Sequence, residues 1–178
     1  DPSVRLITLI GPGGIGKTRL AMQSAAERID YHLGGVWFVS LIPVGDADDI
    51  IPAILTALRI PTLGVDNLLQ TLVNYLRHRD ALLILDNFEH ALTPANLDSI
   101  ARLLTAAPML RILVTSRTRL QMQTERIIEI EGLPSPAPDD DPAAEAFAAV
   151  ELLVRRAQQQ EATFALTAQN KEVIAQIC

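Results

Sequence analysis

The chain has 178 residues, a formal net charge of −6 and 49% hydrophobic residues. Its single cysteine excludes an internal disulfide bond, and its apolar runs fall short of the roughly 18 residues that span a membrane. The acidic balance argues against direct binding of nucleic acid, which depends on clustered Lys and Arg. We therefore expect a cytoplasmic protein that contacts neither a membrane nor, through this segment, a nucleic acid.

Short apolar runs alternate with amphipathic segments over residues 4–117, which is typical of a parallel sheet with helices on both faces. The runs are continuous rather than alternating, as expected for strands that are covered on both sides. The sequence therefore predicts an α/β fold with a five-stranded parallel sheet. The predicted strands are residues 4–10, 35–41, 81–86, 111–115 and 126–130.

Helices are indicated by apolar residues at the spacing of one helix face. The first predicted helix carries Ala21, Ala25 and Ile29, and two more are expected over residues 50–58 and 68–76.

A fourth helix is expected after Thr93, because threonine followed by proline is a favourable cap and first turn. Four prolines and three aspartates then exclude regular structure at residues 134–142, which we interpret as a linker after a nucleotide-binding domain over residues 1–133. Beyond the linker, residues 143–178 predict the start of a small, truncated helical subdomain, in which Thr167 caps the last helix.

The run GPGGIGKTR at residues 11–19 matches the P-loop, or Walker A, pattern G-x-x-x-x-G-K-[ST] between a predicted strand and a predicted helix. Glycines let successive N–H groups turn inward around a phosphate chain, and the helix points its positive end at the same anion. Lys17 supplies a charge for the β and γ phosphates, and Thr18 a hydroxyl for Mg²⁺. The predicted nucleotide-binding residues are Gly11, Pro12, Gly13, Gly14, Ile15, Gly16, Lys17, Thr18 and Arg19.

Two further candidates end apolar strands. Asp86 ends LLILD, a Walker B pattern that would place a carboxylate in the crevice where parallel sheets bind ligands, so Thr18 and Asp86 are the predicted Mg²⁺ ligands. Arg117 ends ILVTSR and would lie at the same edge, where it could sense or stabilise the γ-phosphate. The alternative for Asp86 is an aspartate that merely ends a strand, and the alternative for Arg117 is an ordinary exposed arginine at a strand end.

The order of these parts resembles the NB-ARC type of the STAND class, the signal-transduction ATPases with numerous domains, and in particular the ATPase domain of large bacterial transcriptional regulators. The matching segments are GPGGIGKTRLA, VWFVSL, LLILDNFEH, ILVTSR, EIEGLP, VELLVRRA and FALTAQNKEVIAQIC, which together cover nearly the whole chain. The resemblance implies that the strand VWFVSL lies between the P-loop strand and the Asp86 strand. It also implies an ATP/ADP switch, with an open ATP form, an ADP form closed by helical lids, and slow hydrolysis as the resetting step.

The resemblance assigns phosphate binding to Lys17, Mg²⁺ to Thr18 and Asp86, and reading of the γ-phosphate to Arg117. Many relatives carry a second acid directly after the metal-site aspartate, but this chain has Asn87, whose amide cannot accept a proton at neutral pH. Glu89 could substitute as the base, or be a solvated loop carboxylate. The predicted catalytic residues are Lys17, Asp86, Glu89 and Arg117.

The chain begins without methionine and ends within a helical pattern, so we expect it to be a fragment of a longer protein. The resemblance implies covalently linked output and repeat domains outside residues 1–178, and it leaves nucleotide-dependent oligomerisation open. It also places an adenine-contacting segment upstream and a G-L-P-L element downstream, so we expect the fragment to bind ATP more weakly than the intact protein. A small-molecule kinase and a DNA-dependent AAA-like ATPase are the alternative functions.

Overall fold

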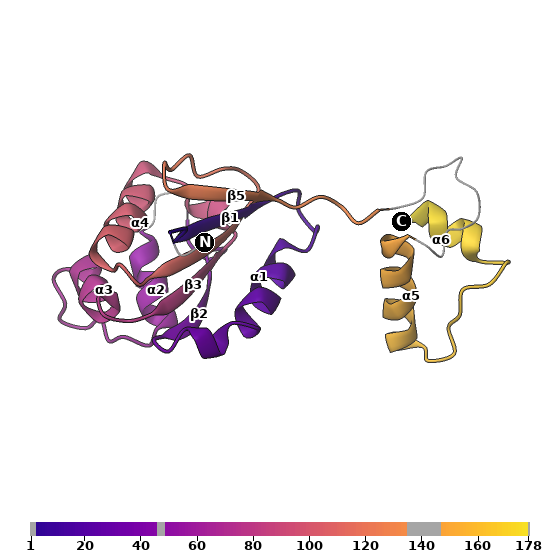
Figure 1. Ribbon diagram of the computed structural model, residues 1–178, viewed down its shortest axis with the longest axis horizontal. Helices are drawn as coiled ribbons and strands as arrows, with labels where there is room; N and C mark the ends of the chain where they lie inside the picture. Colours follow the sequence, from indigo (N-terminus) through magenta and orange to yellow (C-terminus); the bar gives the residue numbers. More distant parts are fainter. Residues whose placement is uncertain (1–2, 46–48, 135–146, 178) are drawn as a thin grey trace. The chain divides into compact units, whose positions relative to one another are not determined.

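The computed structural model describes residues 3–45, 49–134 and 147–177. The chain divides into two compact units, Asp1–Ile130 and Glu131–Cys178 (Figure 1). The division lies close to the predicted end of the nucleotide-binding domain at residue 133. Residues 135–142 of the predicted linker lie outside the described residues.

The first unit is built on a five-stranded parallel sheet with the strand order β2-β3-β4-β1-β5. All five predicted strands are confirmed, with ends that shift by at most two residues, and so is the predicted α/β fold. The strands are β1 (Leu6–Ile10), β2 (Gly35–Ser40), β3 (Ala81–Asp86), β4 (Arg111–Ser116) and β5 (Glu125–Glu129).

One predicted neighbour relation is wrong. The strand VWFVSL, which is β2, does not lie between the P-loop strand β1 and the Asp86 strand β3, because β4 occupies that place and β2 is an edge strand. The burial of the two strands explains the difference: Val114 and Thr115 of β4 are 0% and 1% exposed, whereas Phe38 of β2 is 39% exposed. Helical crossovers let a parallel strand pair away from its neighbours in the chain, so chain order does not fix sheet order.

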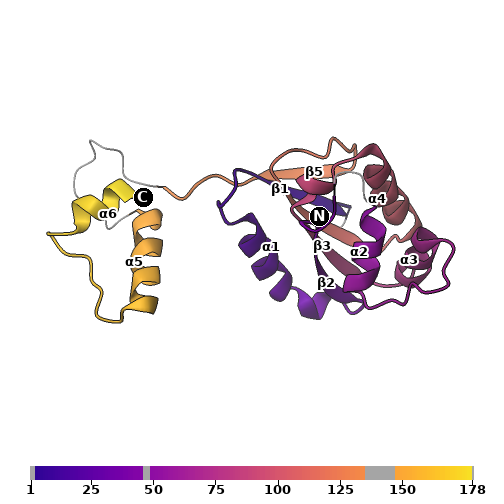
Figure 2. The same cartoon turned by 180° about the vertical axis from the view of Figure 1, so that it is seen from behind.

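Helices cover both faces of the sheet, as predicted. Helix α1 (Lys17–Ala26) packs on one face, and α2 (Ile50–Ala57), α3 (Leu68–Leu76) and α4 (Pro94–Ala106) pack on the other (Figures 1 and 2). Alternate residues of the central strands serve the two faces: Leu82 and Ile84 of β3 join α1, and Leu83 and Leu85 join the larger core. The α1 face therefore has the smaller hydrophobic core, and the face covered by α2, α3 and α4 has the larger one.

In the first unit the helix ends agree with the sequence signals, except at the end of the first helix. Thr93 caps α4, since its hydroxyl accepts a hydrogen bond from the Asn96 N–H at 3.2 Å. Ile29, in contrast, does not continue the buried stripe of α1; it lies in a separate 3-10 turn, η1 (Ile29–Tyr31), and is 58% exposed.

The second unit contributes α5 (Ala148–Gln160) and α6 (Lys171–Ile177), whose buried residues include Val150 and Ile174. Helix α6 begins at Lys171, later than the predicted cap at Thr167. Thr167 instead belongs to the preceding turn, where the Asn170 side-chain oxygen accepts its N–H at 2.8 Å. None of the helices in the described ranges has the length and hydropathy to span a membrane.

Candidate nucleotide-binding site

The P-loop, residues 11–16, joins the end of β1 directly to the start of α1. Glycine is required at Gly11 because an added Cβ would lie 2.7 Å from the carbonyl oxygen of Ile130. Gly16 has a φ of 99°, in the left-handed region that favours glycine, and α1 begins at the next residue. The two glycines therefore let the chain turn from strand to helix within a few residues, so that the helix N-terminus lies against the loop.

The loop presents its backbone to open space. Added Cβ atoms on Gly14 and Gly16 would meet no heavy atom within 4 Å. Within the described ranges, the N–H groups of residues 13–16 donate no hydrogen bond to the protein. These donors and the helix N-terminus behind them fit an anionic group such as a phosphate chain.

Lys17 places the only ammonium of the first unit against this loop. Its side chain is 8% exposed, and Nζ donates hydrogen bonds to the carbonyl oxygens of Gly11 and Pro12, both at 2.8 Å. The other predicted loop residues follow the same turn: Ile15 is half-buried, and Arg19 is exposed on the first turn of α1. All nine predicted nucleotide-binding residues thus lie in one continuous segment, which consists of the loop and the first turn of α1.

The two predicted metal ligands lie in contact. The Thr18 hydroxyl donates a hydrogen bond to Oδ1 of Asp86 at 2.6 Å, although the two residues come from α1 and β3. Asp86 is 4% exposed, at the carboxyl end of its strand. A carboxylate beside a hydroxyl offers the hard oxygen ligands that Mg²⁺ prefers, so this pair fits the ion.

Thr115, which the sequence did not single out, completes this cluster. Its hydroxyl donates to the same Oδ1 of Asp86 at 2.6 Å and accepts the N–H of Asn87 at 3.0 Å. Thr115 contacts Asp86 because β4 lies directly beside β3 in the sheet. The run ILVTSR would have indicated it, had β4 rather than β2 been expected next to the Asp86 strand.

Arg117 and Glu89 form an ion pair beside the P-loop. Nε of Arg117 lies 3.2 Å from Oε1 of Glu89, and an added Cβ on Gly13 would lie 3.5 Å from Nη2 of the same arginine. The Glu89 side chain is 15% exposed, so it is not a solvated loop carboxylate. Both of its oxygens are buried and accept no hydrogen bond from the described part of the chain, because the ion pair has the distance but not the geometry of one.

Asn87 explains how Glu89 reaches this position. Its φ of 61° and ψ of 47° are left-handed, a conformation that asparagine tolerates better than most residues. The turn leads directly into the 3-10 helix η2 (Phe88–Ala91), which is anchored by the fully buried Phe88. Asn87 therefore has a backbone role at the position directly after the candidate metal ligand Asp86.

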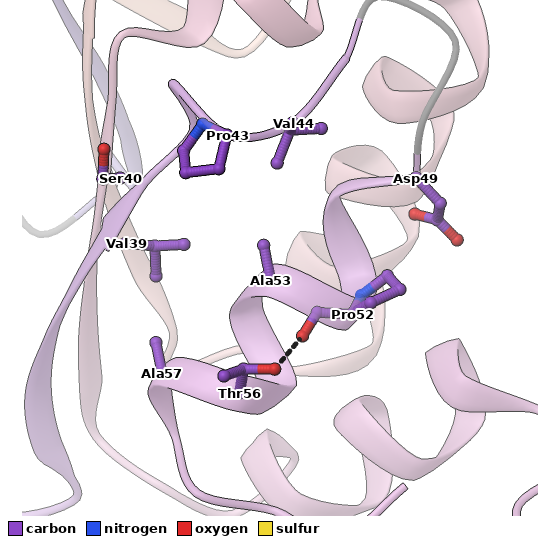
Figure 3. Close-up of a pocket in the computed structure, with 9 residues that line it drawn as sticks. All are labelled: Val39, Ser40, Pro43, Val44, Asp49, Pro52, Ala53, Thr56 and Ala57. Carbon is purple, nitrogen blue, oxygen red and sulfur yellow. Dashed lines mark hydrogen bonds between the residues drawn. The ribbon is translucent and has the colours of Figure 1, made fainter.

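A separate groove of about 590 Å³ lies at the β2 edge, between that strand and α2 (Figure 3). Its walls are mainly apolar, with Val39, Pro43 and Ala53 among them, and Asp49 is the one charged residue among the described residues that line it. No predicted site residue lines this groove. The candidate nucleotide site, which consists of the loop and the strand-end residues, is therefore separate from this groove.

In this site a glycine-rich loop joins a strand to a helix whose first residue is a buried lysine. An aspartate ends a second strand, which is separated from the first by one strand of the sheet. This arrangement defines a P-loop NTPase. A family model described as an AAA domain matches residues 3–122, more than half of the chain. The chain therefore belongs to this AAA-domain family of P-loop NTPases, and membership implies nucleotide binding.

The curated relatives are longer proteins. An uncharacterised protein of Mycobacterium tuberculosis is 33% identical over 176 residues, which cover 98% of this chain and 42% of that protein. A Mycobacterium bovis protein, named as a candidate HTH-type transcriptional regulator, is 34% identical over 176 residues, 98% of this chain and 18% of its own length. This chain thus spans less than half of either relative.

Solved structures share the fold at low sequence identity. Cdc6p of Pyrobaculum aerophilum has a TM-score of 0.67 at 21% identity, over 96% of this chain and 47% of its own. A STAND protein with a tetratricopeptide repeat sensor from Pyrococcus horikoshii has a TM-score of 0.50 at 17% identity, over 97% and 25%. Orc1 of Aeropyrum pernix, solved in complex with DNA, has a TM-score of 0.54 at 18% identity, over 90% and 52%. These likenesses concern the fold alone.

Proposed function

We propose that this chain is the ATP-binding switch domain of a larger signalling or transcriptional regulator of the STAND type, related to NB-ARC domains, in which slow Mg²⁺-dependent hydrolysis of ATP to ADP resets the switch. The observation that carries this proposal is the position of Arg117. It is the cation that lies beside the loop residue Gly13 while paired with a buried carboxylate.

In this proposal the loop and Lys17 hold the nucleotide. The N–H groups of residues 13–16 and the N-terminus of α1 face the phosphates, and the Lys17 ammonium moves from the loop carbonyls to the β and γ phosphates. Thr18 and Asp86 hold Mg²⁺, which neutralises phosphate charge when it is bound. These contacts are common to ATP and ADP, apart from those to the γ-phosphate.

Arg117 supplies the difference between the two nucleotides. Its side chain is 62% exposed and pairs with Glu89, so it can turn toward a γ-phosphate at modest cost in free energy. A phosphate with two or more acceptor oxygens competes well with a carboxylate that offers ion-pair distance but no hydrogen bond. ATP therefore draws Arg117 away from Glu89, and ADP leaves the pair in place.

The same exchange makes Glu89 the candidate general base. Asn87 cannot accept a proton, whereas Glu89 carries a buried carboxylate with free acceptor capacity beside the loop. Glu89 lies on a 3-10 turn and is engaged by Arg117 until the γ-phosphate binds. A base that is released only by its substrate supports hydrolysis at a slow, resetting rate.

The greater length of the curated relatives supports the switch over a free-standing enzyme. Both curated relatives extend well beyond the matched region, and one is named as an HTH-type regulator. We therefore place output and repeat domains outside residues 1–178, with a cytoplasmic location and oligomerisation that depends on the bound nucleotide. Binding of nucleic acid belongs in this proposal to those output domains.

The test is thermal unfolding with ATP, ADP and Mg²⁺. A ligand at 100 times its Kd stabilises the folded state by about 2.7 kcal/mol, and Lys17→Ala should remove this stabilisation. The matched control is Lys171→Ala, because Lys171 is the only other lysine of the chain and lies in the second unit. Wild-type protein that gains nothing from either nucleotide would refute the proposal. Phosphoryl transfer to an added acceptor, or ATP hydrolysis stimulated by DNA, would favour the kinase or the DNA-dependent ATPase instead.

A further inference from the structure

We infer that Thr115 is a positioning residue, which sets the orientation of the Asp86 carboxylate for Mg²⁺ and so determines how strongly nucleotide binding depends on the metal. This inference rests on the proposed function, because it concerns the same site.

The strand register places Thr115 in one row with the site residues. Leu9 of β1 pairs with Thr115 of β4, and Thr115 lies one position past Val114, which pairs with Leu85 of β3. The next residue of β3 is Asp86, so its side chain and that of Thr115 stand side by side on the α1 face. At 1% exposure, Thr115 has little access to water as an alternative hydrogen-bond partner.

The Thr115 hydroxyl acts within the site both as a hydrogen-bond donor and as a hydrogen-bond acceptor. Its one proton goes to Oδ1 of Asp86 at 2.6 Å, and its oxygen accepts the Asn87 N–H at 3.0 Å. One hydroxyl therefore links the metal-site carboxylate to the first residue of the turn that carries Glu89. A valine in its place would keep the shape and lose both bonds.

The hydrogen bonds to Asp86 are unevenly shared between its two oxygens. Thr18 and Thr115 both donate to Oδ1, whereas Oδ2 accepts no side-chain hydrogen bond from the described part of the chain. Two donors on one oxygen fix the rotation of the carboxylate and leave the other oxygen for a cation. Outer partners of this kind typically change metal affinity by about 10- to 100-fold when they are lost.

A second buried threonine separates this role from ordinary packing. Thr8 lies on the adjacent strand β1 at 0% exposure, and its hydroxyl has no hydrogen-bond partner within the described residues. The interior of this sheet thus accommodates a threonine whose hydroxyl does nothing for the site. Thr8→Val is therefore a matched control for Thr115→Val, with the same chemical change one strand away.

The experiment measures the dissociation constant of a non-hydrolysable ATP analogue by calorimetry, across a Mg²⁺ series and in EDTA. Thr115→Val should raise the Mg²⁺ concentration for half-maximal effect about 10-fold and leave the affinity in EDTA within about 2-fold of the wild type. Thr115→Ser, which keeps the hydroxyl, should restore most of the Mg²⁺ response. Thr8→Val should match the wild type throughout. If Thr115→Val does not fold, Thr115→Ala is measured in its place.

Two results would overturn the inference while the proposed function stands. One is a Mg²⁺ response of Thr115→Val equal to that of Thr8→Val. The other is an equal loss of affinity with and without Mg²⁺, which would show that Thr115 supports only the packing of the sheet. If the wild-type protein binds no nucleotide in either condition, the proposed function itself fails and the inference fails with it.

Discussion

Replacing Arg117 by alanine tests the switch at its most specific contact. We expect the affinity for ATP to fall about 10-fold and the affinity for ADP to change less than about 2-fold. The physical reason is that Arg117 contacts only the γ-phosphate in the proposed ATP state, whereas Lys17 and the loop hold the phosphates that both nucleotides share.

The magnitude follows from the surroundings of the guanidinium. A hydrogen bond to a charged group contributes about 1.5–3 kcal/mol. Arg117 is 62% exposed and must leave an ion pair with Glu89 at 3.2 Å, so solvent screening and the lost pair place it at the low end. About 1.4 kcal/mol corresponds to a 10-fold change in the dissociation constant.

The assay is calorimetric titration with ADP and a non-hydrolysable ATP analogue at saturating Mg²⁺. Arg119→Ala is the control, since Arg119 is an exposed arginine on the same connection after β4. Equal losses for the two nucleotides, or no loss for either, would refute the assignment of Arg117 to the γ-phosphate. An equal loss in Arg119→Ala would attribute the effect to general charge instead.

Three other substitutions probe separate parts of the site. Glu89→Gln should lower the rate of steady-state ATP hydrolysis about 100-fold, which is the low end of the range for loss of a general base, and should not weaken ATP binding. An unchanged rate would exclude Glu89 as the base. Asp86→Asn should make the affinity for nucleotide nearly the same in Mg²⁺ and in EDTA, by calorimetry, and a retained Mg²⁺ response would place the metal elsewhere. Gly16→Ala should lower the free energy of unfolding in urea by about 1–2 kcal/mol, because φ is 99° and the added methyl meets no other atom, so the cost is conformational alone. An unchanged urea midpoint would contradict that reasoning.

The sequence predicted most of the fold because the strands of a covered parallel sheet leave a plain signal. Continuous apolar runs such as LLILD and ILVTS are long enough for strands and too short for helices, and all five strands were found. The P-loop was equally clear, since its glycines and Lys17 have fixed spacing. Local chemistry also placed the start of α4 at Thr93.

The sheet order and the contacts across it were not predictable in the same way. Nothing in the run VWFVSL indicates which strands it pairs with; the resemblance placed it between β1 and β3, and only the pairing with β3 is found. The role of Thr115 depends on that order, because its partner Asp86 is 29 residues away along the chain. The burial of Glu89 depends in turn on the left-handed turn at Asn87, which leaves no periodic pattern in the sequence.

The insertion of β4 between β1 and β3 brings the proposed metal and γ-phosphate functions onto one strand. Thr115 lies in β4 and Arg117 directly follows the last residue of that strand, so both residues are at its carboxyl end. Thr115 contacts Asp86, and Arg117 contacts Glu89, so each of these two acids at or after the end of β3 has its partner on or just after β4. A γ-phosphate that draws Arg117 away therefore acts on the same strand end that orients the metal ligand. Ser40 of β2 pairs with Asp86 from the other side of β3, whereas β4 brings Arg117 to the loop. The proposed distinction between ATP and ADP at this edge therefore depends on the position of β4, not of β2.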